Sequence, residues 1–122
     1  MKKLSQKEAL EFAVNTLQKS GALKENALPI ALGIIDAENQ GIKSHGFHYL
    51  PIYCLHLKCG KVKGSANPVL NTISNVSFKV NADNGFAHRA ISLGMEKLVP
   101  SAKENGISSR AITNSYKWGV LG

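Results

Sequence analysis

Residues 76–113 carry the sequence VSFKVNADNGFAHRAISLGMEKLVPSAKENGISSRAIT, whose pattern predicts a strand, a turn, a helix and a second strand. Apolar and polar side chains alternate over residues 76–80, which is the period of a half-buried strand. The following NADNG, residues 81–85, is typical of a turn, because Asp and Asn tolerate turn conformations and Gly85 permits positive φ. The stretch ISSRAIT, residues 107–113, predicts the second strand.

The helix between these strands is predicted over residues 86–105, where apolar side chains return to helical spacing. Asp83 or Asn84 is a candidate cap for its first turn, and Gly106 is placed to follow its C-terminus. Pro100 lies inside this run, so we expect a kink or a break there.

The N-terminal half predicts helices. Ser5 and Glu8 form a capping box at the start of the first helix, which we expect to stop near Gly21. A second helix is expected from about Asn26 to Asn39, with Pro29 in its first turn, where the missing N–H costs little.

A third, shorter helix is predicted over residues 46–59, followed by an irregular connection over residues 60–75 that is rich in Gly, Ser, Asn and Pro. The expected fold class is therefore α+β, with an N-terminal three-helix segment followed by a strand-helix-strand unit. We expect two domains, a helical segment over residues 1–64 and the start of an α/β domain over residues 65–122.

Composition limits the classes of function. The 122 residues are 43% hydrophobic and 19% charged, as in a globular protein. No apolar run approaches the roughly 20 residues that cross a bilayer, and the N-terminus lacks the apolar segment of a signal peptide. We therefore expect a cytoplasmic protein without membrane contact. The net charge of +7 attracts phosphates, but the lysines are dispersed and only Arg89 and Arg110 are arginines, so we favour a solvated surface over a nucleic-acid interface.

Histidines and cysteines are the remaining candidates for chemistry. Cys54 and Cys59 are five residues apart, which matches neither a CxxC zinc site nor a redox pair, so we interpret them as ordinary thiols. His45 and His48 lack accompanying Cys, Asp or Glu at metal-ligand spacing, so no metal is expected. From the residues alone, His45 is open to three interpretations: a packed ring, a cap or a group that titrates.

Two stretches carry a family resemblance. DAENQGIKSHGFHYLPIYCLHLKCGKV, residues 36–62, and the segment from NADNGF to GVLG, residues 81–122, occur in the order and spacing of a known family. They resemble the N-terminal part of the malate/L-lactate dehydrogenase family that is unrelated to Rossmann-type enzymes. That family includes ureidoglycolate, sulfolactate and 2,3-diketogulonate-type dehydrogenases and a piperideine-carboxylate reductase, so the resemblance implies an incomplete part of that fold.

The resemblance assigns roles to five residues. It implies that His45, in the Ser-His-Gly motif, is the acid/base group in hydride transfer, a role that suits imidazole near neutral pH. Tyr49 stands where the family commonly has a carboxylate-binding arginine, and Lys117 where it commonly has a histidine, so these two are substrate-binding candidates. Ser44 and Asn114 are the implied cofactor-binding residues, for NAD or NADP.

The expected function is an NAD(P)-dependent oxidoreductase that transfers hydride between the nicotinamide cofactor and a small 2-hydroxy or 2-oxo acid. The resemblance implies that family members continue well past Gly122 and that the later portion carries most of the cofactor site, so we expect a truncated and inactive fragment. It also implies a homodimer for the full-length family. The alternative is a non-catalytic interaction module, or the N-terminal half of a split enzyme that binds a separate C-terminal chain.

Overall fold

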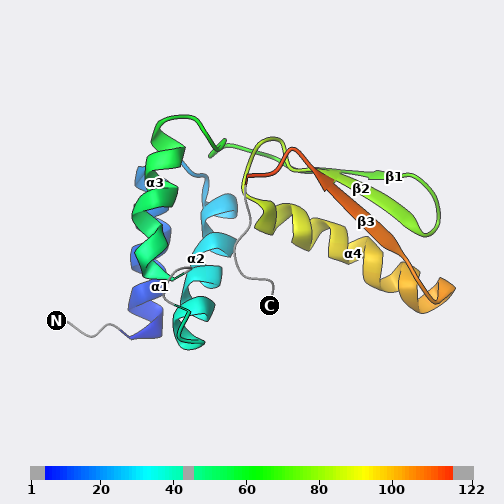
Figure 1. Ribbon diagram of the computed structural model, residues 1–122, viewed down its shortest axis with the longest axis horizontal. Coiled ribbons are helices and arrows are strands. Elements are labelled where there is room, and N and C mark those ends of the chain that lie inside the picture. Colours follow the sequence, from blue (N-terminus) through cyan, green and yellow to red (C-terminus); the bar gives the residue numbers. More distant parts are fainter. Residues whose placement is uncertain (1–4, 43–45, 117–122) are drawn as a thin grey trace. The chain divides into compact units, whose positions relative to one another are not determined.

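The structure is a computed structural model that describes residues 5–42 and 46–116. The chain divides into two compact units, with the change between Ser65 and Ala66. The first unit contains helices α1 (Gln6–Lys19), α2 (Lys24–Asn39) and α3 (Leu50–Lys58), with the 3₁₀ helix η2 (Phe47–Tyr49) before α3 (Figure 1). None of the described helices combines the length and apolar character needed to cross a bilayer.

Helix α1 begins as its sequence predicts. The Ser5 hydroxyl accepts a hydrogen bond from the Glu8 amide at 3.2 Å and donates one to the Glu8 carboxylate at 3.0 Å. One face of the helix is buried and packs on α2 and α3, while Phe12 on its flank is 53% exposed. The buried residues are Ala9, Ala13, Val14 and Leu17.

Helix α2 starts two residues earlier than predicted, so Pro29 lies inside it and not in its first turn. The reason is non-local. The Leu23 amide donates to the Gly64 carbonyl at 3.0 Å, which fixes Leu23 as the N-cap. The buried Asn26 side chain donates to the same carbonyl at 2.8 Å. This bonding ties the start of α2 to the end of the segment that follows α3.

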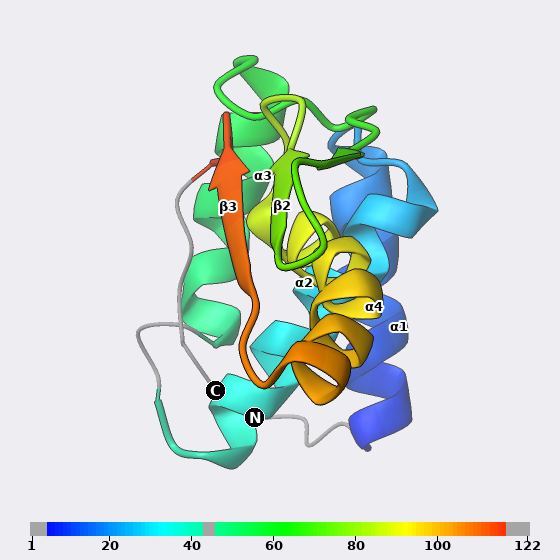
Figure 2. The same ribbon diagram turned by 90° about the vertical axis from the view of Figure 1, so that its right-hand side faces the viewer.

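The second unit is a three-stranded sheet packed against one helix (Figure 2). Strand β2 (Ser77–Asn81) pairs antiparallel with β1 (Val69–Thr72) and parallel with β3 (Ser109–Thr113), and α4 (Ala87–Asn105) connects β2 to β3. Buried Val80, Ala82 and Ala90 form its core. The strand-helix-strand unit is thus confirmed, and the fold class is α+β.

Two local expectations for this unit are wrong. The segment predicted to be irregular contains β1, which is mostly exposed and therefore lacks the alternating pattern that reveals a half-buried strand. Helix α4 continues through Pro100, so the break that was one of the two expected outcomes does not occur, and Gly106, whose φ is 85°, is its C-cap.

Candidate functional site

The carboxyl ends of β2 and β3 lie at the same edge of the sheet because the two strands are parallel. Asn81 pairs in register with Thr113, and the Ala82 amide donates to the Thr113 carbonyl at 2.9 Å. The turn into α4 and the segment after β3 therefore meet. In α/β sheets, ligands characteristically bind at this edge.

Three asparagine or aspartate residues at this edge adopt left-handed backbone conformations. Asp83, Asn84 and Asn114 have φ of 55°, 60° and 52°, and Gly85, expected to supply the positive φ, does not. Short polar side chains reduce the cost of this conformation because they hydrogen-bond locally. The cap prediction is also wrong, because the N-cap of α4 is Phe86, without a side-chain cap bond.

Hydrogen bonds lock the two segments together. The Asn84 amide donates to the Asn114 carbonyl at 2.8 Å, and the Tyr116 amide donates to the Gly85 carbonyl at 2.9 Å. The Asn81 carboxamide oxygen accepts from the Asp83 amide at 2.9 Å and from the Asn114 side chain at 3.3 Å. Because Asn114 and Asn84 are exposed, this network holds polar groups where a ligand can reach them.

The start of α4 adds an imidazole that sequence reasoning missed. His88 Nδ1 is buried and has no hydrogen-bond partner among the described residues. Burial lowers the pKa of His88 below its ordinary value of 6.5, so the ring is neutral near pH 7. The neighbouring Arg89 hydrogen-bonds within the protein: its guanidinium donates to the Ala66 carbonyl and to the Asn67 side chain, both at 3.1 Å.

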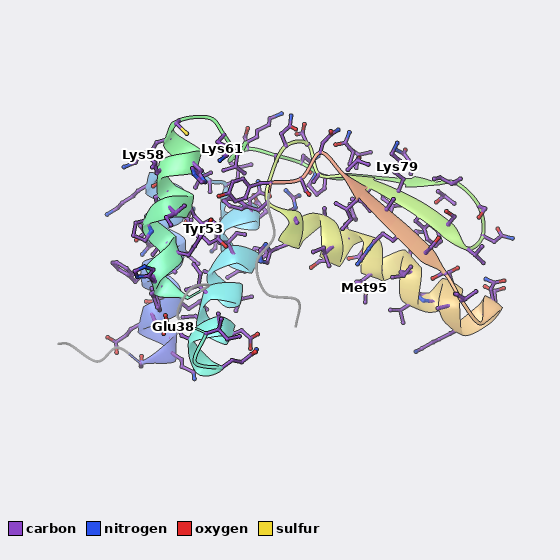
Figure 3. The ribbon with its side chains drawn as sticks, in the orientation of Figure 1. Glu38, Tyr53, Lys58, Lys61, Lys79 and Met95 are labelled. Atoms are coloured by element: carbon purple, nitrogen blue, oxygen red, sulfur yellow. The ribbon has the colours of Figure 1, made fainter. Side chains whose placement is uncertain are left out.

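The Ser-His-Gly motif lies in the first unit. Ser44 and His45, like Lys117, fall outside the described residues, but Gly46 is within them. The Glu38 carboxylate accepts a hydrogen bond from the Phe47 amide at 2.8 Å. A Cβ on Gly46 would collide with the same carboxylate, so a larger residue there would require the Glu38 side chain to move. Figure 3 shows Glu38 near the C-terminal end of α2.

Tyr49, the substrate-binding candidate, is half-buried in η2. Its ring meets that of Tyr53 edge-on, with centroids 4.7 Å apart and an interplanar angle of 63°. Tyr53 is buried, and this burial raises the pKa of its phenol. Tyr49 belongs to the first compact unit and Asn114 to the second.

Within the described ranges, no three His, Cys, Asp or Glu side chains form a group that could hold a metal ion.

Residues 4–122 match the family described as Malate/L-lactate dehydrogenase. The chain belongs to the malate/L-lactate dehydrogenase family. It is 36% identical over 119 residues to the (2R)-3-sulfolactate dehydrogenase (NADP(+)) of Chromohalobacter salexigens, covering 98% of this chain and 35% of that one. It is 34% identical over 119 residues to the Δ¹-pyrroline-2-carboxylate reductase of Ancylobacter novellus, covering 98% and 35% of the two chains.

Two solved structures contain the fold of this chain over about 35% of their own length. The Δ¹-piperideine-2-carboxylate reductase of Pseudomonas syringae pv. tomato superposes with a TM-score of 0.91 at 28% identity, covering 94% of this chain and 35% of that one. The sulfolactate dehydrogenase of Methanocaldococcus jannaschii superposes with a TM-score of 0.87 at 25% identity, covering 98% and 35%. The chain therefore spans about 35% of the length of the relatives it matches.

The left-handed conformation of Asn84 can be tested without disturbing a packed side chain, because this residue is exposed. We expect Asn84→Ala to lower the free energy of unfolding by about 1 kcal/mol, since alanine has no side chain to offset the steric cost. Asn84→Gly has no such cost and should stay near the wild-type value. Urea denaturation measures both, and equal losses in the two variants would contradict the strain argument.

His88 predicts a pH dependence of stability. Because its folded-state pKa is lowered, the unfolded chain binds more protons below pH 6.5. The stability that His88 contributes is therefore complete above that pH and is lost as pH falls through the folded-state pKa. Urea denaturation between about pH 7 and pH 5 should show a shallower loss in His88→Gln than in wild type, while His48→Gln is the control for removing one histidine. Identical slopes in wild type and His88→Gln would contradict the prediction.

Proposed function

We propose that this chain supplies the acid/base part of an oxidoreductase that transfers hydride between NAD or NADP and a small 2-hydroxy or 2-oxo acid. Family membership supports the proposal, as do the relatives' names. Sulfolactate is a 2-hydroxy acid, and pyrroline-2-carboxylate is a cyclic imine beside a carboxylate. In both reactions hydride is exchanged at the carbon next to the carboxylate and a proton at the attached heteroatom: the hydroxy acid loses both from carbon and oxygen, and the imine gains both at carbon and nitrogen.

The observation that carries the proposal is the hydrogen bond that holds the chain shortly after His45. The bond from the Phe47 amide to the Glu38 carboxylate restrains the backbone two residues after the histidine. An acid/base group must be held within hydrogen-bond reach of its substrate, and such a constraint serves that purpose. In the proposed reaction, His45 gives a proton to the carbonyl oxygen as the carbon receives hydride.

Tyr49 and Lys117 are the proposed substrate contacts. A phenol offers the substrate carboxylate one hydrogen bond, whereas an arginine would offer a charged fork. Lys117 would add a positive charge for an anionic group of the substrate. With Tyr49 in place of that arginine, we expect the chain to bind the substrate carboxylate more weakly.

Ser44 and Asn114 are the proposed cofactor contacts. At the β2–β3 edge, two features of the described residues suit cofactor binding. The Asn114 side-chain oxygen has no hydrogen-bond partner among them, and the first turn of α4 has amides without a side-chain cap. A carboxamide oxygen can accept from the nicotinamide amide group, and a helix N-terminus favours a phosphate. When bound, the cofactor supplies the hydride.

The assembly is proposed on the family resemblance. We propose domains over residues 1–64 and 65–122, which the change of compact unit after Ser65 supports. We further propose a homodimer in the cytoplasm.

The alternative role is an interaction module or the N-terminal half of a split enzyme. Large exposed apolar side chains favour it, such as Leu55, 60% exposed, and Ile107, 75% exposed.

A chimera tests the oxidoreductase proposal. This chain replaces the matched third of the Chromohalobacter salexigens enzyme, and NADPH oxidation is measured with the oxo acid of sulfolactate. We expect His45→Ala to lower kcat by at least about 100-fold, as for loss of a general acid. His48→Ala, an exposed histidine three residues away, should leave the rate near that of the parent chimera. A folded, active chimera that is insensitive to His45→Ala would refute the proposal.

The same assay tests the role of Tyr49. Tyr49→Arg in the chimera should raise kcat/KM for the oxo acid by about tenfold, because a guanidinium restores a charged, forked contact with the carboxylate. An unchanged kcat/KM in a folded variant would separate Tyr49 from carboxylate recognition.

A further inference from the structure

The dipeptide Asn-Gly occurs twice in this chain, at residues 84–85 and 105–106. Asparagine is a thermolabile residue, and a following glycine makes it more so, because glycine has no side chain to hinder attack by its backbone nitrogen on the asparagine carboxamide. Both asparagines are exposed. Asn84 lies in the turn after β2 and Asn105 is the last residue of α4, so the fold places the two dipeptides in different surroundings.

Such a dipeptide can deamidate with water as the only co-reactant. The Gly85 backbone nitrogen attacks Cγ of Asn84, and the new C–N bond closes a succinimide ring. The carboxamide C–N bond breaks, and its nitrogen leaves as ammonia with the proton that the Gly85 nitrogen gives up. Water then opens the ring at one of its two carbonyls, which gives either aspartate or isoaspartate. In isoaspartate the backbone runs through the side chain, which adds one carbon before the next nitrogen.

Hydrogen bonds restrain both reacting groups at Asn105. Its carboxamide, which contains the leaving nitrogen, donates to the Ser101 carbonyl at 3.0 Å. The Gly106 amide, which contains the attacking nitrogen, donates to the Ala102 carbonyl at 2.8 Å. Deamidation at Asn105 therefore requires a local opening of the helix end that breaks both bonds.

At Asn84 only the attacking group is restrained. The Gly85 amide donates to the Ala82 carbonyl at 2.9 Å, so opening of this single turn bond frees the attacking nitrogen. The Asn84 carboxamide makes no hydrogen bond to another described residue, and its exposed side chain can rotate toward that nitrogen. The turn after β2 is thus less protected against deamidation than the end of α4.

We propose that Asn84 is the residue at which this chain deamidates first, and that its isoaspartate form breaks the contact between the turn after β2 and the segment after β3. The Asn84 amide makes this contact by donating to the Asn114 carbonyl at 2.8 Å. The Gly85 carbonyl completes it by accepting from the Tyr116 amide at 2.9 Å. The carbon that isoaspartate adds lies between these two points of contact, so the bonds lose their spacing.

The test ages the purified whole chain in mildly alkaline buffer, where the attacking amide loses its proton more readily. Peptide mapping by mass spectrometry follows the conversion of Asn84 and Asn105 in the same sample. We expect Asn84 to convert at least about fivefold faster, which is the effect of the one further hydrogen bond at Asn105 on local opening. In urea the fold no longer distinguishes the two dipeptides, so their rates should agree within about twofold.

Hydrogen exchange measures what the modification does to the turn. The amides of Asn84 and Tyr116 should lose protection in aged protein whose isoaspartate is confirmed by enzymatic methylation. Asn84→Asp introduces the same charge with a backbone of normal length, so it should keep the protection of both amides. Asn84→Gln, whose longer side chain closes a ring less readily, should remove conversion at the turn and leave the rate at Asn105 unchanged. Circular dichroism confirms that each variant is folded.

Three results would overturn the proposal. One is conversion of Asn105 as fast as that of Asn84 in the folded chain, and another is the same ratio of rates in the folded chain and in urea. The third is full protection of the Asn84 and Tyr116 amides in protein that contains isoaspartate. None of these results bears on the effect of His45→Ala in the chimera, so the two proposals fail separately.

Discussion

The parallel pairing of β2 with β3 is the constraint on which the candidate cofactor edge depends. Parallel neighbours need a crossover, and α4 provides it while covering the buried Val80. The pairing brings the turn after β2 against the segment after β3, where Asn84 donates to Asn114. Polar groups that are far apart in sequence thus meet at one exposed edge, and the backbone accepts left-handed conformations to hold them there.

The sequence was sufficient for features that depend on neighbours along the chain. The Ser5 cap, the alternation that buries Phe78 and Val80, and the glycine that ends α4 all follow from local patterns. Features that depend on distant partners could not be predicted in this way. The early start of α2 depends on a carbonyl at Gly64, and strand β1 exists because β2 offers it a pairing edge.

The same distinction between local and distant contacts applies to the candidate site. The Ser-His-Gly motif and Asn114 were found because the whole series of motifs resembles a family. The hydrogen bond from the Phe47 amide to Glu38, and the burial of His88 Nδ1, depend on contacts that spacing does not reveal. In NADNG the turn itself was predicted, but its positive φ values fall on Asp83 and Asn84 because the bond to Asn114 orients their backbone.

The central claim is the proposal that this chain binds a nicotinamide cofactor through the β2–β3 edge. The most direct test is an NMR titration of ¹⁵N-labelled chain with NADPH and NADH, which also detects weak binding. The account predicts saturable shifts of the Asn84 and Asn114 amide signals. Absence of any shift, or shifts confined to residues of the first compact unit, would contradict it.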